Sequence, residues 1–154
     1  MIFVSFGNSP VPFIRMAEAV DKYASESGEK IIVQSGQTKY HFKHCEAVPF
    51  MDKNVFRSHL ESCEIAILQG GWGSISEASD MGVRIIAIPR INGVEHYHDQ
   101  VQLVKALENE KILIGCYDIT MLPQLVETAK VYEFCPIVRG DASKIINEFL
   151  NLIS

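Results

Sequence analysis

The chain has 154 residues, of which 47% are hydrophobic and 21% are charged, and its formal net charge is -5 at pH 7. This composition excludes a disordered chain, and the length suits one α/β domain spanning residues 1–154. The negative charge argues against broad nucleic-acid binding, so we expect no nucleic-acid partner. No apolar run approaches the roughly 18 residues of a membrane span, and Met1 leads straight into a strand without a signal peptide. We therefore expect a soluble, cytoplasmic protein.

Apolar runs alternate with amphipathic segments along the chain, which predicts alternating strands and helices. The predicted strands are 2–6, 30–34, 46–48, 64–68, 83–88 and 112–114. The predicted helices are 12–27, 55–63, a short helix after the glycines near 70, 99–108, 122–130 and 142–153. Residues 39–44 fit neither pattern. Because most strands are continuously apolar, we expect a single Rossmann-like domain with a parallel sheet and helices on both faces.

Three loops follow predicted strands directly, namely Gly7–Pro10, Gln69–Gly73 and Pro89–His98. In an open parallel sheet, ligands bind beyond the carboxyl ends of the strands. We therefore expect all three loops to lie along one edge of the sheet, where a ligand would bind.

The stretch Gln69–Glu77 carries the strongest local signal for a ligand. A strand runs into a glycine-rich turn that opens a helix, and the free N–H groups of such a helix start favour an anion. Ser74 and Glu77 also fit a capping box, in which the two side chains satisfy backbone N–H groups. The stretch matches neither G-x-G-x-x-G nor a P-loop.

The segment Glu95–Gln100 contains His96, His98 and Asp99, a combination that could bind zinc. Its spacing does not match a complete metal motif, and a polar ligand-facing loop is the alternative interpretation. We expect no metal site. The four cysteines have no C-x-x-C spacing, which favours buried, reduced thiols. They are Cys45, Cys63, Cys116 and Cys135.

The ordered set Gly-Gly-Trp-Gly-Ser-x-x-Glu (70–77), Gly82-Val83, Pro89 and Asp99-Gln100 resembles the donor-binding half of GT-B glycosyltransferases of family 28. The segments Phe3–Gly7 and Val48–Met51 also fit that half. The resemblance implies that backbone N–H groups of Gly71–Ser74 hold the diphosphate of a UDP-sugar and that Glu77 accepts hydrogen bonds from the ribose diol. It implies no required cofactor, because a helix N-terminus can stabilise the departing UDP without a metal.

The same resemblance implies further contacts in the donor site. Phe50 and Met51 would border the uracil, Asp99 and Gln100 would read sugar hydroxyls, and the first loop would approach the phosphate or sugar. The full donor-binding set implied is Gly7, Asn8, Ser9, Phe50, Met51, Gln69, Gly70, Gly71, Trp72, Gly73, Ser74, Glu77, Asp99 and Gln100. Gln69 departs from the family pattern, since many relatives carry His there.

A complete GT-B enzyme has a second α/β half that binds the acceptor and commonly supplies the catalytic base, and we expect no such half in this protein. The chain thus resembles the soluble catalytic subunit of two-subunit transferases. These include the eukaryotic enzyme that adds the second N-acetylglucosamine to a dolichol-linked precursor and bacterial pairs that build exopolysaccharide. The resemblance implies inverting sugar transfer to a lipid-diphosphate-linked acceptor. It places the base on a membrane-associated partner subunit, to which this chain would bind peripherally.

Two other hypotheses remain open from the sequence. One is a non-catalytic nucleotide-binding regulatory module of the same fold. The other is an epimerase-like enzyme or metal-dependent hydrolase centred on His96, His98 and Asp99.

Overall fold

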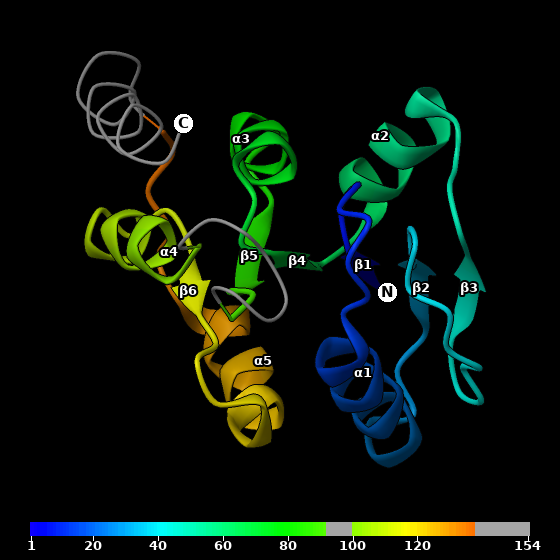
Figure 1. Cartoon of the computed structure of the whole chain (residues 1–154). Helices are drawn as coiled ribbons and strands as arrows, with labels where there is room; N and C mark the ends of the chain where they lie inside the picture. Colours follow the sequence, from blue (N-terminus) through cyan, green and yellow to red (C-terminus); the bar gives the residue numbers. More distant parts are fainter. Residues whose placement is uncertain (92–99, 138–154) are drawn as a thin grey trace.

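The computed structural model describes residues 1–91 and 100–137, which form a six-stranded, fully parallel sheet (Figure 1). The strand order is β3-β2-β1-β4-β5-β6, the order of doubly wound nucleotide-binding folds. The strands are β1 (Ile2–Ser5), β2 (Ile31–Gln34), β3 (Glu46–Val48), β4 (Ile65–Gln69), β5 (Arg84–Ile88) and β6 (Ile114–Gly115). The predicted parallel sheet is confirmed.

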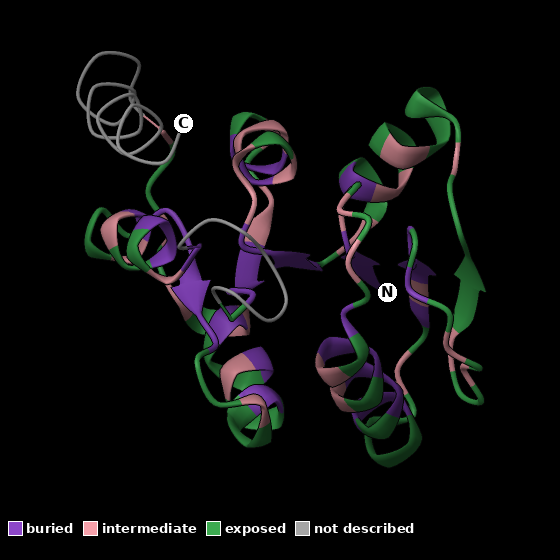
Figure 2. Cartoon of the chain, viewed as in Figure 1, coloured by how far each residue is buried: buried purple, intermediate pink, exposed green. Residues whose placement is uncertain are grey.

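Helices cover both faces of this sheet, as the sequence predicted (Figure 1). The helices are α1 (Ile14–Ser27), α2 (Lys53–Ser62), α3 (Trp72–Asp80), α4 (Gln100–Asn109) and α5 (Leu122–Val131), with a short 3₁₀ helix η1 (Ile119–Met121) before α5. Helices α1 and α5 pack on one face, and α2, α3 and α4 pack on the other. Figure 2 shows the central strands buried between these layers and the edge strand β3 exposed.

Some predicted boundaries are wrong, for local reasons. Helix α2 begins at Lys53 rather than at residue 55, because the Asp52 side chain accepts a hydrogen bond from Asn54 N and caps the helix. The last strand is predicted at 112–114, but the strand that pairs with β5 is Ile114–Gly115, so only Ile114 of the predicted strand belongs to it. Ile112 and Leu113 are buried against the α2–α4 face instead, so their apolar character reflects core packing. The helix predicted at 142–153 lies outside the described residues.

The four cysteines are free, but they are not all buried as expected. Cys116 is buried, Cys45 and Cys63 are half-buried, and Cys135 is exposed. Cys135 follows α5 at the edge of the described fold, where its backbone N–H bonds to Lys111 O. Within the described part of the chain, none of the helices has the length and apolar character needed to cross a bilayer.

Candidate donor-binding site

The candidate site lies where the strand order reverses, between β1 and β4. Strand β1 pairs with both β2 and β4, so the chain leaves β1 toward one face of the sheet and leaves β4 toward the other. Such a reversal opens a crevice at the carboxyl ends of the two strands. The loop that begins at Gly7 and the turn that begins at Gly70 both emerge there, as predicted.

A cleft of about 390 Å³ occupies this position. Its volume falls in the range of roughly 300–1,000 Å³ that is usual for small-molecule sites. The lining residues come from the ends of β1, β2 and β3 and from the starts of α2 and α3. They are Gly7, Asn8, Gln34, Phe50, Met51, Lys53, Phe56, Gly73, Ser74 and Glu77.

Helix α3 directs its first turn into the cleft. It begins at Trp72, and its N-cap residue is Gly71, which provides no side-chain cap. Ser74 is therefore the third helical residue, and the capping box that Ser74 and Glu77 could have formed is absent. The first N–H groups of a helix have no partner within the helix, so those at Gly73 and Ser74 are oriented to bind an anion. No acidic side chain lies in this first turn to compete with one.

The Gln69 side chain explains two of the glycines. A Cβ on Gly7 would lie 2.6 Å from Gln69 Nε2, and a Cβ on Gly71 would collide with the same atom. Gly7 also has a φ of +72°, which L side chains rarely adopt. Gln69 thus lies between the first loop and the glycine turn, and is itself only 9% exposed. It packs beneath the cleft and does not line it.

Gln100 extends this packing to a third loop. Its Nε2 donates to Gln69 Oε1 at 2.7 Å, and its Oε1 accepts from Arg90 N at 2.9 Å. The residue is 5% exposed. In this arrangement both ends of the amide are engaged within the protein, and a contact with a sugar hydroxyl would require the buried side chain to become accessible.

The opposite end of the cleft is apolar and includes residues that the sequence did not single out. Phe50 is exposed and Phe56 is half-buried, while Met51 N donates to Gln34 Oε1 at 3.0 Å. Gln34 is buried at the end of β2, and its Nε2 donates to Ser5 Oγ at 3.4 Å. The signal in the sequence was a polar residue closing the apolar run Ile31–Val33. An aromatic and sulfur-containing wall of this kind suits a planar base.

Glu77 and Lys53 are the only ionisable side chains among the described residues that line the cleft. Glu77 is one helical turn from Ser74 and is 28% exposed. Its Oε1 lies 3.8 Å from Nε of Arg57, which is half exposed, so the ion pair is weak and leaves the carboxylate available to a ligand.

Other predicted residues lie near the cleft or outside the described chain. Ser9 accepts a hydrogen bond from Val11 N, and Trp72 packs against the core on the α2–α4 face. Gly70 is buried, where a Cβ would press on Gln100 and Pro89. Asp99 and both histidines of the metal hypothesis, His96 and His98, lie outside the described residues.

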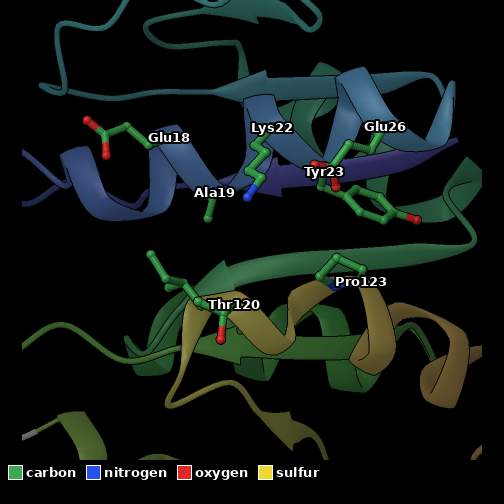
Figure 3. A pocket seen from close by; sticks show the side chains of 8 residues that line it. Glu18, Ala19, Lys22, Tyr23, Glu26, Thr120 and Pro123 are labelled. Atoms are coloured by element: carbon green, nitrogen blue, oxygen red, sulfur yellow. The ribbon is translucent and has the colours of Figure 1, made fainter.

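A separate hollow of about 270 Å³ lies between α1 and the η1–α5 segment (Figure 3). It is lined by Glu18, Ala19, Lys22, Tyr23, Glu26, Ile119, Thr120 and Pro123. None of these residues lines the cleft at the carboxyl edge, and none of them is a glycine. Seven of the residues predicted to bind the donor line the carboxyl-edge cleft instead, namely Gly7, Asn8, Phe50, Met51, Gly73, Ser74 and Glu77.

This fold and cleft define a Rossmann-like α/β domain of the kind that forms the C-terminal half of GT-B glycosyltransferases. The family model for the glycosyltransferase family 28 C-terminal domain matches residues 1–131. The chain belongs to that family. No curated protein matches the sequence.

Three solved glycosyltransferases share the fold at low sequence identity. They are the glycotransferase of kitacinnamycin (TM-score 0.63, 17% identity), Acinetobacter baumannii MurG (0.59, 14%) and SnogD from Streptomyces nogalater (0.54, 16%). The matches cover 98%, 97% and 99% of this chain but only 38%, 49% and 43% of the respective neighbours. The chain therefore spans less than half the length of each of these three proteins.

Proposed function

We propose that this chain is the UDP-sugar-binding catalytic subunit of an inverting glycosyltransferase that acts on a lipid-diphosphate-linked acceptor. The observation that carries the proposal is the cleft at the reversal between β1 and β4. There the uncapped start of α3, the glycine loop after β1 and the Glu77 carboxylate face one space. Family membership supports sugar transfer as the reaction.

The cleft has the chemistry for each part of a UDP-sugar. The wall formed by Phe50, Met51 and Phe56 suits the uracil, and Glu77 can accept hydrogen bonds from both ribose hydroxyls. The N–H groups at the start of α3 suit the diphosphate. Asp99 and Gln100 remain proposed contacts of the sugar, Gln100 on the condition that its side chain, which is buried in this structure, becomes accessible.

Transfer would proceed by a single displacement. A base removes the proton of the acceptor hydroxyl as its oxygen bonds to the anomeric carbon. The bond from that carbon to the UDP oxygen breaks, and the electron pair leaves with UDP. The dipole and free N–H groups of α3 stabilise the growing negative charge on the diphosphate. No metal or other cofactor is needed in this scheme.

The base is proposed to come from a partner. If Glu77 is engaged by the ribose, the described residues that line the cleft offer no second carboxylate and no imidazole to act as the base. We propose that a membrane-associated, acceptor-binding subunit supplies the base and holds this chain at the membrane surface. Exopolysaccharide or lipid-linked oligosaccharide synthesis is the setting that suits such a pair.

The test measures UDP binding by the isolated chain and sugar transfer by the chain with and without its partner subunit. The isolated chain should bind UDP, and transfer to a lipid-diphosphate acceptor should require the partner. Efficient transfer by the isolated chain would contradict the two-subunit proposal.

The alternative is a non-catalytic nucleotide-binding module, which is favoured by the scarcity of ionisable groups among the described cleft residues. Glu77→Ala in the reconstituted pair distinguishes the two. Loss of turnover with the subunits still associated supports the enzyme. Nucleotide binding without transfer by the wild-type pair supports the module.

A further inference from the structure

Arg90 is the largest fully buried side chain in the described part of the chain, with 1% exposure. It follows Pro89 at the carboxyl end of β5. Its Nη2 donates to Phe6 O at 3.0 Å and its Nη1 donates to Val11 O at 2.8 Å. The guanidinium also lies over the Phe13 ring, 4.5 Å from the centroid. A cation this deeply buried is costly, so its contacts are expected to have a specific use.

The two carbonyls that Arg90 binds bracket the first loop of the cleft. Phe6 immediately precedes Gly7, and Val11 follows Pro10, so one planar group fixes both ends of the segment that presents Gly7 and Asn8. Gly7 has a φ of +72° and is conformationally permissive by nature. Without an external tie, such a loop would sample many conformations and would lose more entropy on ligand binding.

The same residue ties this loop to the other two loops at the edge. Arg90 N donates to Gln100 Oε1, and Gln100 Nε2 donates to Gln69 Oε1. Gln69 in turn packs between Gly7 and Gly71. The loops after β1, β4 and β5 are therefore connected through buried polar contacts that meet at Arg90, whose guanidinium binds the first loop and whose backbone N–H binds Gln100.

We infer that Arg90 is a positioning residue for the donor's diphosphate, an inference that rests on the proposed function. It acts through the carbonyls of Phe6 and Val11 and does not touch the ligand. It holds the Gly7–Asn8 loop against the start of α3, so that both sides of the diphosphate cradle are formed before the donor arrives. We expect Arg90 to influence the binding of the diphosphate and not that of the uracil, because the residues proposed to contact the uracil come from the ends of β2 and β3 and from α2.

Arg84 provides a matched control within the same strand. Its Nη1 donates to two backbone carbonyls, Ala129 O at 2.7 Å and Tyr132 O at 2.8 Å. Its guanidinium lies 5.8 Å from the centre of the Phe134 ring. Like Arg90, Arg84 therefore binds two backbone carbonyls and lies against an aromatic ring. Unlike Arg90, it is at the amino end of β5, away from the cleft. Lysine preserves the charge at either position but cannot reproduce the planar fork.

The experiment titrates the wild-type chain, Arg90→Lys and Arg84→Lys with UDP and, separately, with uridine, and follows binding by NMR. We expect Arg90→Lys to lower UDP affinity about tenfold, as for a loop that is competent only about one-tenth of the time, while uridine affinity stays the same. Arg84→Lys should leave both affinities unchanged.

Three outcomes would overturn the inference. Arg90→Lys could bind UDP as tightly as the wild type, or it could lose UDP and uridine affinity in equal proportion, as expected for a general structural role. Either result leaves the proposed donor site standing. A wild-type chain that binds no UDP would instead overturn the donor site, and the positioning role with it. If Arg90→Lys does not fold, Phe13→Leu removes the ring under the guanidinium and should show the same selective loss.

Discussion

Gly73 has open space where a side chain would begin, since no heavy atom lies within 4 Å of a Cβ built there. It occupies the second position of α3 and lines the cleft. Gly71, two residues earlier, has no such space because Gln69 fills it. Two neighbouring glycines are therefore required for different reasons, Gly71 by the protein's own packing and Gly73 by the ligand proposed to lie beside it.

Gly73→Ala should separate stability from binding. Alanine is the better helix former, so the free energy of unfolding should rise by up to about 1 kcal/mol. The added methyl would occupy the space proposed for the diphosphate and should weaken UDP binding by about 1–3 kcal/mol, as for other overpacked sites. Urea unfolding and UDP titration of one preparation check both effects. Unchanged UDP affinity would contradict the placement of the diphosphate at the start of α3.

Glu77 allows the ribose contact to be tested through the ligand. Glu77→Ala should lower affinity for UDP by about 1.5–3 kcal/mol, the range for hydrogen bonds to a charged group, and should lower affinity for 2′-deoxy-UDP by less. The measurement is a pair of calorimetric titrations for each protein. Asp80→Ala, at the exposed end of the same helix, is the control and should bind both nucleotides as the wild type does. Equal losses for the two nucleotides would exclude a contact with the 2′-hydroxyl.

At the scale of elements, the connection between β2 and β3 is the unusual part of the fold. Residues 35–45 cross between two parallel strands without a helix. Asp21 of α1, which is 5% exposed, holds this connection by accepting hydrogen bonds from Lys43 N and His44 N, the latter at 2.9 Å. Tyr40 and Phe42 pack against the α1–α5 face. Most crossovers between parallel strands contain a helix. Here the connection has none, and hydrogen bonds to the Asp21 carboxylate hold it against α1.

Asp21→Asn should destabilise the chain by about 1–3 kcal/mol, because an amide keeps only one acceptor oxygen and turns N–H donors toward the loop's own N–H groups. The urea midpoint measures the change. Glu18→Gln, an exposed change on the same helix, should shift stability by less than about 0.5 kcal/mol. A variant of Asp21 as stable as the wild type would show that core packing alone holds residues 35–45.

The sheet and most helices could be predicted from the sequence because their signals are local. Continuous apolar runs such as Ile65–Leu68 identify buried parallel strands, and the glycines after β4 identify the turn into α3. Residues 39–44 could not be assigned, because the groups that order them lie on α1. Arg90 and Gln34 were missed for the same reason. A lone arginine after Pro89 shows no pattern until folding brings Phe6 and Val11 within its reach.

At the scale of the whole molecule, burial of the thiols makes stability depend on pH in the alkaline range. Burial raises the pKa of the Cys116 thiol from 9.0 to about 11, and burial together with the Asp21 carboxylate raises the pKa of Cys45 to about 12. A raised pKa means that the folded state favours the neutral thiol. The resulting stabilisation is complete below pH 9 and is lost as the pH rises from 9 toward 11.

Comparison of the wild type with Cys116→Ala at about pH 8 and pH 10 checks this dependence. The wild type should be the more stable protein at the lower pH, since alanine leaves a small cavity. The difference in unfolding free energy should shrink by about 1 kcal/mol at the higher pH, where only the wild type has this thiol to ionise on unfolding. A difference that does not change with pH would contradict the raised pKa of Cys116.

The central claim is that the carboxyl-edge cleft binds the donor nucleotide, and an NMR titration of the full chain with UDP tests it most directly. The backbone N–H signals of Gly7, Asn8, Gly73 and Ser74 should shift together with that of Met51, because these residues line the one cleft in which we propose that the diphosphate and the uracil bind. Signals around the α1–α5 hollow should not move. Shifts confined to that hollow, or no shifts at saturating UDP, would contradict the account.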